Sequence, residues 1–280
     1  MLRIITDTAC DLPAELTEQY GIIKLPMNIA FDAETFADQQ TITTEQFYQR
    51  LVGGKEFPTT SYPSLGLLEL ALQQELSAGN EVLVITIARA LSGFYDSARI
   101  MLADYPRERA AVYDSQSATL GEGAIVLAAA RLAAAGQTLA QVEQVLPEII
   151  ERSRGYGAIN NLVYLARGGR ISNATAQVAR ALNIKPVINI CADGSLEVAA
   201  KVRGMNKALA WLKQRVKEDG TDFSSTTLFV SYILQKDSAE KLLEELKAEL
   251  KLGEVILCPI GPTVGVHLGP GCVALFYLRP

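Results

Sequence analysis

Apolar runs and amphipathic stretches alternate along the first half of the chain. Strands are predicted at 2–6, 81–87 and 109–114, because each is a short apolar run bounded by turn-forming residues. The run at 81–87, EVLVITI, is typical of a strand buried on both faces of a parallel sheet. Helices are predicted at 65–79, where leucines recur at helical spacing, and over the alanine-rich stretch that follows 109–114. This β-α-β-α order predicts a parallel sheet with helices on both faces.

The segments between these elements are shorter. Helices are predicted at 13–20, where a proline occupies a first-turn position, and at 43–52, where a threonine can cap the start. Residues 21–31 predict one or two strands. Residues 53–64, GGKEFPTTSYPS, predict a loop, because glycine, proline and hydroxyl residues dominate them.

A second region begins near residue 157, after a helix predicted at 138–153. It contains fewer strand-helix-strand units than the first. Strands are predicted there at 184–190, 196–204, 226–233, 254–260 and 272–278, and helices at 205–218 and 238–250. A chain of 280 residues exceeds the commonest domain size, so we expect two domains, 1–157 and 158–280.

The composition is that of an ordinary globular protein, with 49% hydrophobic and 20% charged residues. The net charge of −5 and the pI near 5.2 argue against a nucleic acid or an anionic membrane as the main partner, since both require clustered Lys and Arg. The N-terminus reaches Asp7 before an apolar core of signal-peptide length develops, and Arg131 interrupts the most apolar helical stretch. We therefore expect a cytoplasmic protein without stable membrane insertion.

The four cysteines, Cys10, Cys191, Cys258 and Cys272, are scattered without a C-x-x-C pair, and a single histidine cannot complete a usual zinc site with them. We interpret them as reduced, mostly buried thiols. The chain also lacks a P-loop, a complete G-x-G-x-x-G, a G-x-S-x-G and an H-E-x-x-H motif. We therefore expect no metal and no nucleotide site in this chain.

Three polar turns stand where a strand ends or a helix begins, at 6–13, 58–64 and 88–98. In open α/β sheets strand C-termini and helix N-termini converge at one edge, where unpaired N–H groups bind anions. The hydroxyls and amides of the three turns together predict a receptor for one small anionic group. In the last turn, Gly93 after Ser92 permits close approach of the backbone to a ligand.

Each turn also has a structural interpretation. Asp7 and Asp11 can cap the first helix, because Ser, Thr and Asp are common at helix starts. For the same reason, the cap of the leucine-rich helix can include Thr60, Ser61 and Ser64. The hydroxyl-rich segment 114–123 is interpreted as a cap in the same way. The sequence alone leaves both interpretations open.

Arginines flank two glycines in LARGGRIS, where Arg167 and Arg170 lie, and Arg203 occurs in KVRG. A guanidinium group binds oxyanions through two parallel hydrogen bonds, so these arginines suit a phosphate or the carboxylate of a partner. A surface turn with solvated charges explains them equally well.

The sole histidine, His267, lies in GPTVGVHLGPG, residues 261–271, which contains so much glycine and proline that we expect neither a regular helix nor a strand. Such loops often carry function, so we interpret His267 as a ligand-binding residue. A nucleophilic pair of Ser92 with His267 is conceivable, but no carboxylate that could orient the histidine is evident.

Eight short motifs follow one another over essentially the whole chain: IITDTACDLP, TTSYPS, ALSGFYDSA, YDSQSATLGEG, YLARGGRIS, LNIKPVI, KVRG and HLGPG. Their order and spacing resemble those of the DegV family, bacterial fatty-acid-binding proteins that include the binding subunit of fatty acid kinase. The resemblance implies an α/β fold with two domains. The first is a three-layer α/β/α domain with a parallel sheet, and the second a two-layer α/β domain with a mixed sheet.

The resemblance also implies site residues. Family members enclose one long-chain fatty acid, such as palmitate, with its carboxylate near the cleft between the domains. Thr60, Ser92 and His267 match the family residues that contact the carboxylate. Ser61 and Gly93, their neighbours in the same motifs, are expected in the same site.

Two arginines match family positions associated with phosphate handling and docking of the kinase subunit, Arg170 and Arg203. Some positions depart from the family pattern: Tyr62 replaces the usual glutamine, and Phe94 the usual threonine. TIAR, residues 86–89, stands where a Ser-Ser pair is common. These departures concern the lining of the pocket and hence the preferred acyl chain.

The resemblance therefore implies a fatty-acid-binding protein of phospholipid metabolism. It presents the carboxylate to a separate ATP-dependent fatty acid kinase subunit, which phosphorylates it to an acyl phosphate, and it has no catalytic machinery and no cofactor of its own. Two alternatives remain. One is a serine hydrolase or acyltransferase with Ser92 as nucleophile, and the other is a lipid-sensing protein whose partner contacts change on loading.

Overall fold

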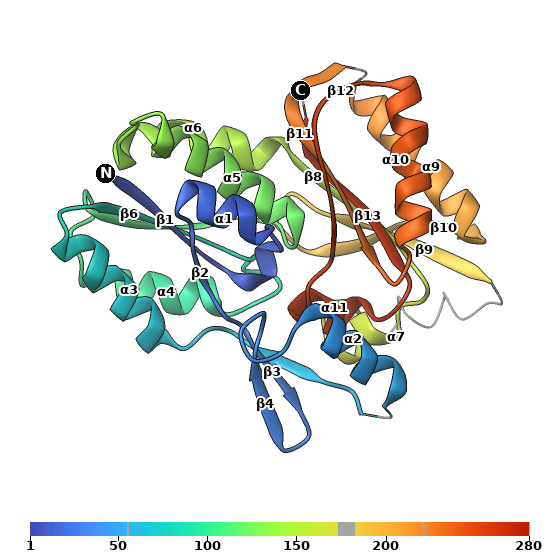
Figure 1. Cartoon of the computed structure of the whole chain (residues 1–280), viewed down its shortest axis with the longest axis horizontal. Coiled ribbons are helices and arrows are strands. Elements are labelled where there is room, and N and C mark those ends of the chain that lie inside the picture. Colours follow the sequence, from blue (N-terminus) through green and yellow to red (C-terminus); the bar gives the residue numbers. More distant parts are fainter. Residues whose placement is uncertain (55, 173–182, 221, 280) are drawn as a thin grey trace.

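The computed structural model describes residues 1–54, 56–172, 183–220 and 222–279. Within these residues it contains a four-stranded, a six-stranded and a three-stranded sheet. Figure 1 shows the four-stranded sheet on the left and the six-stranded sheet on the right, each with helices packed on it. The α/β class predicted from the sequence is confirmed.

The four-stranded sheet is parallel throughout, in the order β2-β1-β6-β7. Its strands are β1 (Leu2–Asp7), β2 (Ile23–Leu25), β6 (Glu81–Thr86) and β7 (Ala110–Asp114). The elements around it are the 3-10 helix η1 (Thr8–Cys10) and the helices α1 (Ala14–Tyr20), α3 (Leu65–Ser77), α4 (Phe94–Leu102), α5 (Leu120–Ala134) and α6 (Leu139–Arg152). The predicted parallel sheet is therefore confirmed.

Helices cover both faces of this sheet and produce the three expected layers. On one face, Leu68 and Leu72 of α3 and Phe94 of α4 share an apolar cluster with Val82 and Val84 of β6. The helices α1, α5 and α6 lie on the opposite face (Figure 1). Because both faces are covered, the strands need apolar residues at nearly every position, which explains their continuous apolar sequences.

The six-stranded sheet has the order β10-β9-β8-β13-β11-β12. Its strands are β8 (Ser153–Ile159), β9 (Ile184–Ile190), β10 (Leu196–Arg203), β11 (Asp222–Ile233), β12 (Lys251–Pro259) and β13 (Cys272–Leu278), and helices α7 (Val163–Arg167), α9 (Met205–Asp219) and α10 (Lys236–Glu249) lie among them in sequence. All neighbours are antiparallel except β11 and β12, which are parallel. The expected mixed sheet is confirmed.

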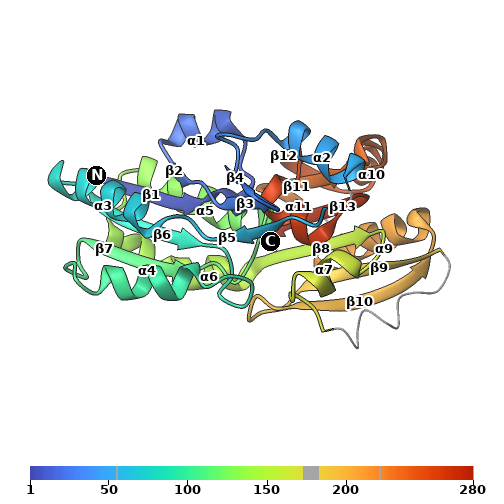
Figure 2. The ribbon, with the colours of Figure 1, turned by 90° about the horizontal axis from the view of Figure 1, so that it is seen from below.

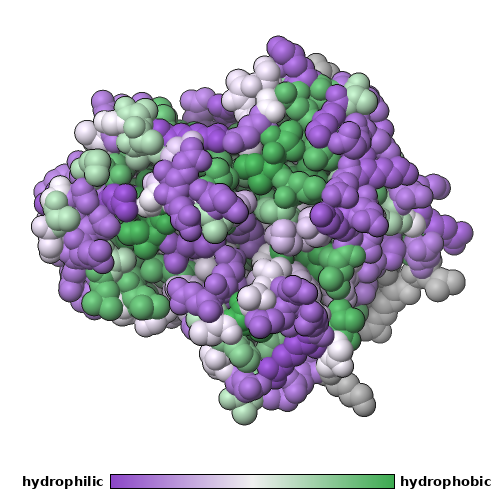
Figure 3. Space-filling model, viewed as in Figure 1, coloured by the Kyte–Doolittle hydropathy of each residue, from purple (hydrophilic) through white to green (hydrophobic). Residues whose placement is uncertain are grey.

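Alternate residues of β13 serve opposite faces of this sheet. Leu275 and Tyr277 belong to the apolar cluster beneath α9 and α10. Ala274 and Phe276 belong to the cluster that includes the first half of the chain. The outer surfaces of α9 and α10 are hydrophilic, as the purple area at the right of Figure 3 shows. Helices α9 and α10 therefore cover one face of the sheet, and the other face is turned toward the four-stranded half.

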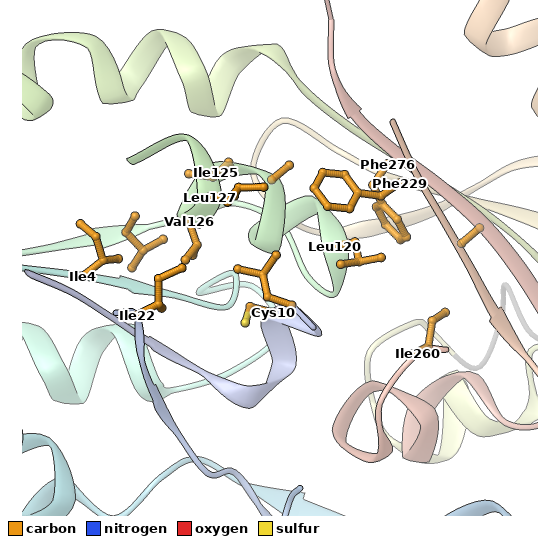
Figure 4. Packing of buried hydrophobic residues seen from close by; sticks show 14 of the residues in the cluster. Ile4, Cys10, Ile22, Leu120, Ile125, Val126, Leu127, Phe229, Ile260 and Phe276 are labelled. Atoms are coloured by element: carbon orange, nitrogen blue, oxygen red, sulfur yellow. The ribbon is translucent and has the colours of Figure 1, made fainter. Parts of the chain in front are cut away.

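Helix α5 lies between the two larger sheets. Residues 120–127 are buried without interruption, as expected for a helix that meets protein on all sides. In Figure 4, Leu120 lies beside Phe229 and Phe276 of the six-stranded sheet, and Val126 lies toward Ile22 of the first half. One apolar cluster thus extends through both halves of the protein.

The boundary expected near residue 157 lies within β8. This strand pairs along its whole length, Ser153 to Ile159, with β13 of the six-stranded sheet. A division at 157 therefore cuts a strand that belongs entirely to the second half. The two domains 1–157 and 158–280 stay a prediction.

A small antiparallel sheet of three strands, β4-β3-β5, lies across the region where the larger sheets meet (Figure 2). It contains β3 (Asn28–Phe31), β4 (Glu34–Ala37) and β5 (Thr59–Ser61), and helix α2 (Thr44–Gly53) separates β4 from β5. The loop predicted at 53–64 is wrong in part, because β5 lies within it. Three polar residues give no periodic signal, and their strand depends on hydrogen bonds to β3.

The expectation of an irregular loop at 261–271 is wrong. Helix α11 occupies Pro262–Leu268. Pro262 lies in its first turn, where a missing N–H costs nothing, and Gly265 packs against the phenol of Tyr48 so closely that a Cβ there would overlap the hydroxyl oxygen. Packing against a distant helix therefore outweighs the poor helix propensity of the segment.

The four cysteines are free thiols. Cys10 and Cys272 are buried, whereas Cys191 and Cys258 are half-buried. Burial raises the pKa of the Cys272 thiol to about 12, so it stays protonated at neutral pH.

Two acidic residues after β1 are buried. Asp7 caps η1 by accepting a hydrogen bond from Ala9 N at 3.0 Å, so the capping interpretation is confirmed for Asp7, although the helix is η1 and not α1. Asp11 does not cap α1, which begins after Pro13 without a side-chain cap. Burial raises the pKa of Asp7 to about 7 and that of Asp11 to about 8.

We expect the free energy of unfolding to fall as the pH rises from 7 to 8. The folded protein keeps the Asp11 carboxyl protonated up to a pKa of about 8, whereas the unfolded chain releases this proton near the ordinary value of 3.8. Each pH unit therefore lowers stability by about 1 kcal/mol for such a carboxyl while it stays protonated in the fold. Urea denaturation at both pH values measures the slope. Asp11→Asn, which cannot titrate, flattens it, and an unchanged slope in this variant contradicts the assignment.

Candidate functional site

A cavity of about 340 Å³ lies between the six-stranded sheet and the polar turns of the first half. Its volume is within the range of roughly 300–1,000 Å³ that is usual for small-molecule pockets. Apolar and polar residues line different parts of this cavity. Strands β8, β9 and β13 supply mainly apolar residues, whereas β5, the turn before α4, the segment after α7 and helix α11 supply polar ones.

The apolar part is formed by residues on one face of the sheet: Gly155, Gly157, Ile188, Ile190, Ala274 and Phe276. A Cβ on Gly155 would lie only 2.8 Å from Ile190 Cδ1 and 2.9 Å from Phe276 Cδ1, so a larger residue does not fit there. Residues 155 and 157 alternate along β8 and therefore share a face. Because the two glycines have no side chains, they leave the volume over this face of the sheet open as part of the cavity.

The five residues predicted for the carboxylate site all line the polar part of this cavity: Thr60, Ser61, Ser92, Gly93 and His267. They come from β5, from the turn before α4 and from α11. Thr60 Oγ1 lies 2.9 Å from His267 Nε2, although 207 positions separate the two residues in the sequence. The fold thus brings the predicted residues together.

Backbone hydrogen bonds position the hydroxyls. Thr60 stands opposite Ile29 in the β3–β5 pair. Ser92 N donates to Ala88 O at 3.1 Å, and Ser92 Oγ accepts a hydrogen bond from Phe94 N at 3.3 Å. The Ser92 hydroxyl therefore sits at the first turn of α4, where unpaired N–H groups favour an anion.

His267 is neutral at pH 7 in this structure. Burial, and next the nearby charge of Arg170, lower its pKa to about 4. Its Nε2 faces Thr60, and its buried Nδ1 has no hydrogen-bond partner among the described residues. Nδ1 packs against Gly168, where a Cβ would overlap it. The imidazole is therefore held as a neutral hydrogen-bonding group.

Arg170 provides a positive charge at this end of the cavity. Its half-buried guanidinium donates from Nε and Nη2 to Leu91 O at 3.0 and 2.9 Å, and from Nη1 to Gly168 O. Burial lowers its pKa, but an arginine side chain stays charged at neutral pH. The alternative of a solvated surface charge does not hold for Arg170, because carbonyl oxygens fix its position.

The other two arginines do not line this cavity. Arg203 is exposed at the end of β10 and is not among the residues that line the cavity. The exposed Arg167 places its guanidinium carbon 3.6 Å from the centre of the Phe57 ring. The fold therefore brings Arg170 to the predicted carboxylate site and leaves Arg203 apart.

The described residues show no hydrogen bond between Ser92 and His267. The imidazole Nε2 faces Thr60, and no described carboxylate bonds to Nδ1. A serine nucleophile requires a base within hydrogen-bond reach, itself oriented by a third group. This arrangement does not favour the hydrolase alternative.

A second, more polar cavity of about 350 Å³ shares Thr60, Arg170 and His267 with the first. Its other side is lined by residues that include Phe57 and Arg167. The hydrogen-bonded side chains of Thr60 and His267 therefore line both cavities and stand between the apolar one and the polar one. No motif in the sequence had indicated this second cavity.

A family model described as "Uncharacterised protein, DegV family" matches residues 1–279. The chain belongs to the DegV family. A DegV domain-containing protein of Caldanaerobacter subterraneus subsp. tengcongensis is 32% identical over 276 residues, which cover 99% of this chain and 98% of that protein. The resemblance seen in the eight motifs is thereby confirmed.

Two solved structures of the DegV family or its relatives are similar over nearly their whole length. A fatty-acid-binding DegV family protein from Thermus thermophilus has a TM-score of 0.91 and 28% identity, covering 100% of this chain and 99% of that one. A stearic-acid-binding protein from Eubacterium ventriosum has a TM-score of 0.89 and 28% identity, covering 100% and 98%. Both confirm the predicted fold.

Two of the three departures from the family pattern, Tyr62 and Phe94, lie in contact in this DegV protein. The rings of Tyr62 and Phe94 are stacked, with centres 6.1 Å apart and planes 21° apart. Tyr62 lines the cavity beside Gly93, and Phe94 is fully buried below it. The pair forms one aromatic unit at the polar end.

Sequence reasoning missed the apolar lining from β8. Two glycines in GYGAI, at alternate strand positions, were a usable signal, since glycine within a strand often marks a site of close approach.

In the described part of this DegV chain, no helix combines the length and the apolar character needed to cross a bilayer.

We expect the imidazole of His267 to titrate with a pKa of about 4 in the lipid-free protein. As the only histidine, its ring nitrogens give an unambiguous signal in a ¹H–¹⁵N NMR pH titration. Arg170→Met removes the adjacent positive charge and shifts this pKa upward. A midpoint near the ordinary value of 6.5 contradicts the buried, neutral state.

Proposed function

We propose that this DegV protein binds one long-chain fatty acid in the cavity beside α5. The carboxylate lies among Thr60, Ser92 and His267, with Ser61 and Gly93 at its edge, and the acyl chain runs over the glycines of β8. The observation that carries this proposal is the lining itself. One end combines hydroxyls, an imidazole and the Arg170 cation, and the rest is apolar.

The energetics divide the task between tail and head group. Burying about a dozen methylenes at about 0.8 kcal/mol each supplies on the order of 10 kcal/mol before ordering costs. Hydrogen bonds to the carboxylate contribute about 1.5–3 kcal/mol each, which desolvation of the carboxylate largely offsets. The tail therefore supplies affinity, and the head group supplies orientation.

The similar proteins support this ligand class. One is described as binding a fatty acid and another as binding stearic acid, and each matches this chain from end to end. A cavity in the same fold with an apolar floor and one polar end suits such a ligand.

We further propose that the bound carboxylate is presented to a separate ATP-dependent kinase subunit, which converts it to an acyl phosphate. Support comes from the second, polar cavity, which lies across the Thr60–His267 pair and shares Arg170. A phosphoryl group that approaches from that side meets a fixed cation. The exposed Arg203 is free to serve the docking of the partner.

In this proposal the chain has no catalytic activity of its own. Residues 1–157 supply the hydroxyl turns, and residues 158–280 supply the histidine helix and the arginines. Its place is the bacterial cytoplasm, where a fatty acid is converted for phospholipid synthesis.

We expect denaturing extraction of the purified protein to release long-chain fatty acid, detected by mass spectrometry. After removal of lipid, Thr60→Val and Ser92→Ala each weaken palmitate binding by about 10- to 100-fold, because each removes one hydrogen bond to a charged group. Titration calorimetry measures the change. Ser64→Ala, an exposed serine outside the cavity lining, serves as the control and leaves the affinity unchanged.

Two outcomes contradict the proposal. One is the absence of lipid from the extract together with no binding of added palmitate. The other is stable labelling of Ser92 by a fluorophosphonate, which supports the hydrolase alternative.

We also expect Gly157→Val to reduce affinity for long chains more than for short ones. A Cβ at this position meets Ala274 and Cys272 at 3.7 and 3.8 Å, an ordinary contact, so the protein folds while the added methyl groups fill part of the cavity. The ratio of palmitate to octanoate affinity falls about tenfold or more, as expected for the loss of a few buried methylenes. An unchanged ratio shows that the acyl chain does not run over β8.

A further inference from the structure

We infer that the turn after β1, residues 7–11, is a hub that positions all three elements of the carboxylate site. Asp7, Thr8 and Asp11 are positioning residues, each of which holds one of these elements by accepting a hydrogen bond from its backbone. This inference rests on the proposed function, because it explains how the fatty acid head group is recognised. None of the three residues lines the cavity.

Asp7 holds the turn that carries Ser92. Its Oδ2 accepts a hydrogen bond from Ile87 N at 3.0 Å, while Oδ1 accepts one from Ala9 N at 3.0 Å. Ile87 itself lines the cavity and is the first residue after β6. The chain then continues directly into the turn with Ser92. One buried carboxyl group thus connects η1 to that turn.

Thr8 holds the sheet that carries Thr60. Its hydroxyl oxygen accepts a hydrogen bond from Met27 N at 3.0 Å. Met27 immediately precedes β3, in which Ile29 pairs with Thr60 and Asn28 with Ser61. Displacement of β3 relative to η1 therefore moves both hydroxyls.

Asp11 holds the helix that carries His267. Its Oδ1 accepts a hydrogen bond from Gly261 N at 3.0 Å, at the start of α11. A Cβ on Gly261 would overlap this oxygen, so the two groups are in direct contact. Two further bonds fix the same end: Thr263 Oγ1 donates to Asp38 Oδ2 at 2.5 Å, and Tyr48 Oη donates to Ile260 O at 2.9 Å.

The three hydrogen bonds differ from those of an ordinary helix cap, which join neighbouring residues. Each joins residues that lie from 19 to 250 positions apart, and each is buried. Such a bond is strong only while its geometry holds, and leaving its N–H unpaired is costly. A metal does not explain the acids, since no group of three or more potential ligands among the described residues can hold one.

The experiment compares palmitate with its methyl ester, using the full chain stripped of lipid. The two ligands share a tail, so the ratio of their affinities reports the head-group site alone. We expect Asp7→Ala, Thr8→Val and Asp11→Ala each to lower this ratio about tenfold or more, the size expected for losing part of a charge-assisted hydrogen bond. A purely structural role lowers both affinities together and leaves the ratio unchanged.

Conservative variants sharpen the test. Asp11→Asn and Thr8→Ser keep an acceptor oxygen and retain the ratio. Asp7→Asn does not, because Asp7 accepts two backbone N–H groups with its two oxygens and an amide offers one acceptor. Glu122→Ala is the matched control. Glu122 is equally buried but accepts from Thr6 Oγ1 within β1, so this variant loses stability and keeps the ratio.

The outcomes separate this inference from the proposed function. If the wild type does not bind palmitate, or binds it no better than the ester, the proposed carboxylate site is wrong. If the wild type discriminates and folded Thr8→Val and Asp7→Ala variants discriminate equally well, the hub is wrong. Thr8→Val keeps the shape of the side chain and so remains testable if an alanine variant fails to fold.

Discussion

Burial of α5 between the two larger sheets is the constraint on which the rest of the structure depends. Residues 120–127 of α5 are buried all round the helix, so protein must cover this part of it from both directions. This requirement holds the six-stranded sheet against the parallel half. The cavity lies at the start of α5, where Ala118 and Thr119 line it and the glycines of β8 face it. The ligand space is thus a consequence of how the two halves share one helix.

The polar end of the cavity combines three kinds of group with different roles. Hydroxyls and backbone N–H groups direct hydrogen bonds at a small anion, and the neutral imidazole of His267 completes the set without adding a charge. The positive charge comes from Arg170, whose guanidinium group is held in place by hydrogen bonds to two backbone carbonyl oxygens. In the proposed function, a carboxylate that loses its water meets fixed donors, which cost little reorganisation on binding.

Fixing those donors has an energetic cost elsewhere in the molecule. Asp7 and Asp11 are buried and accept hydrogen bonds from backbone N–H groups of distant elements, and burial raises the pKa of both well above ordinary values. A protein selected for stability alone has little need of such groups, because apolar packing avoids their desolvation. Asp7 and Asp11 hold two of the three elements of the proposed carboxylate site, which indicates a requirement for exact placement of that site.

The sequence by itself determined the elements of the parallel half, the mixed order of the second half and, through its motifs, the membership of the DegV family. Strand and helix periodicity depends on the spacing of neighbouring residues, so the chain displays it directly. Only the tertiary structure decided that Thr60 meets His267, that residues 262–268 form a helix and that Arg203 lies apart from Arg170. The site residues could be named from a resemblance, but their convergence depends on contacts across as many as 250 positions, such as that of Asp11 with Gly261. The spacing of residues along the chain does not predict such contacts, because they form only when packing brings the distant elements together.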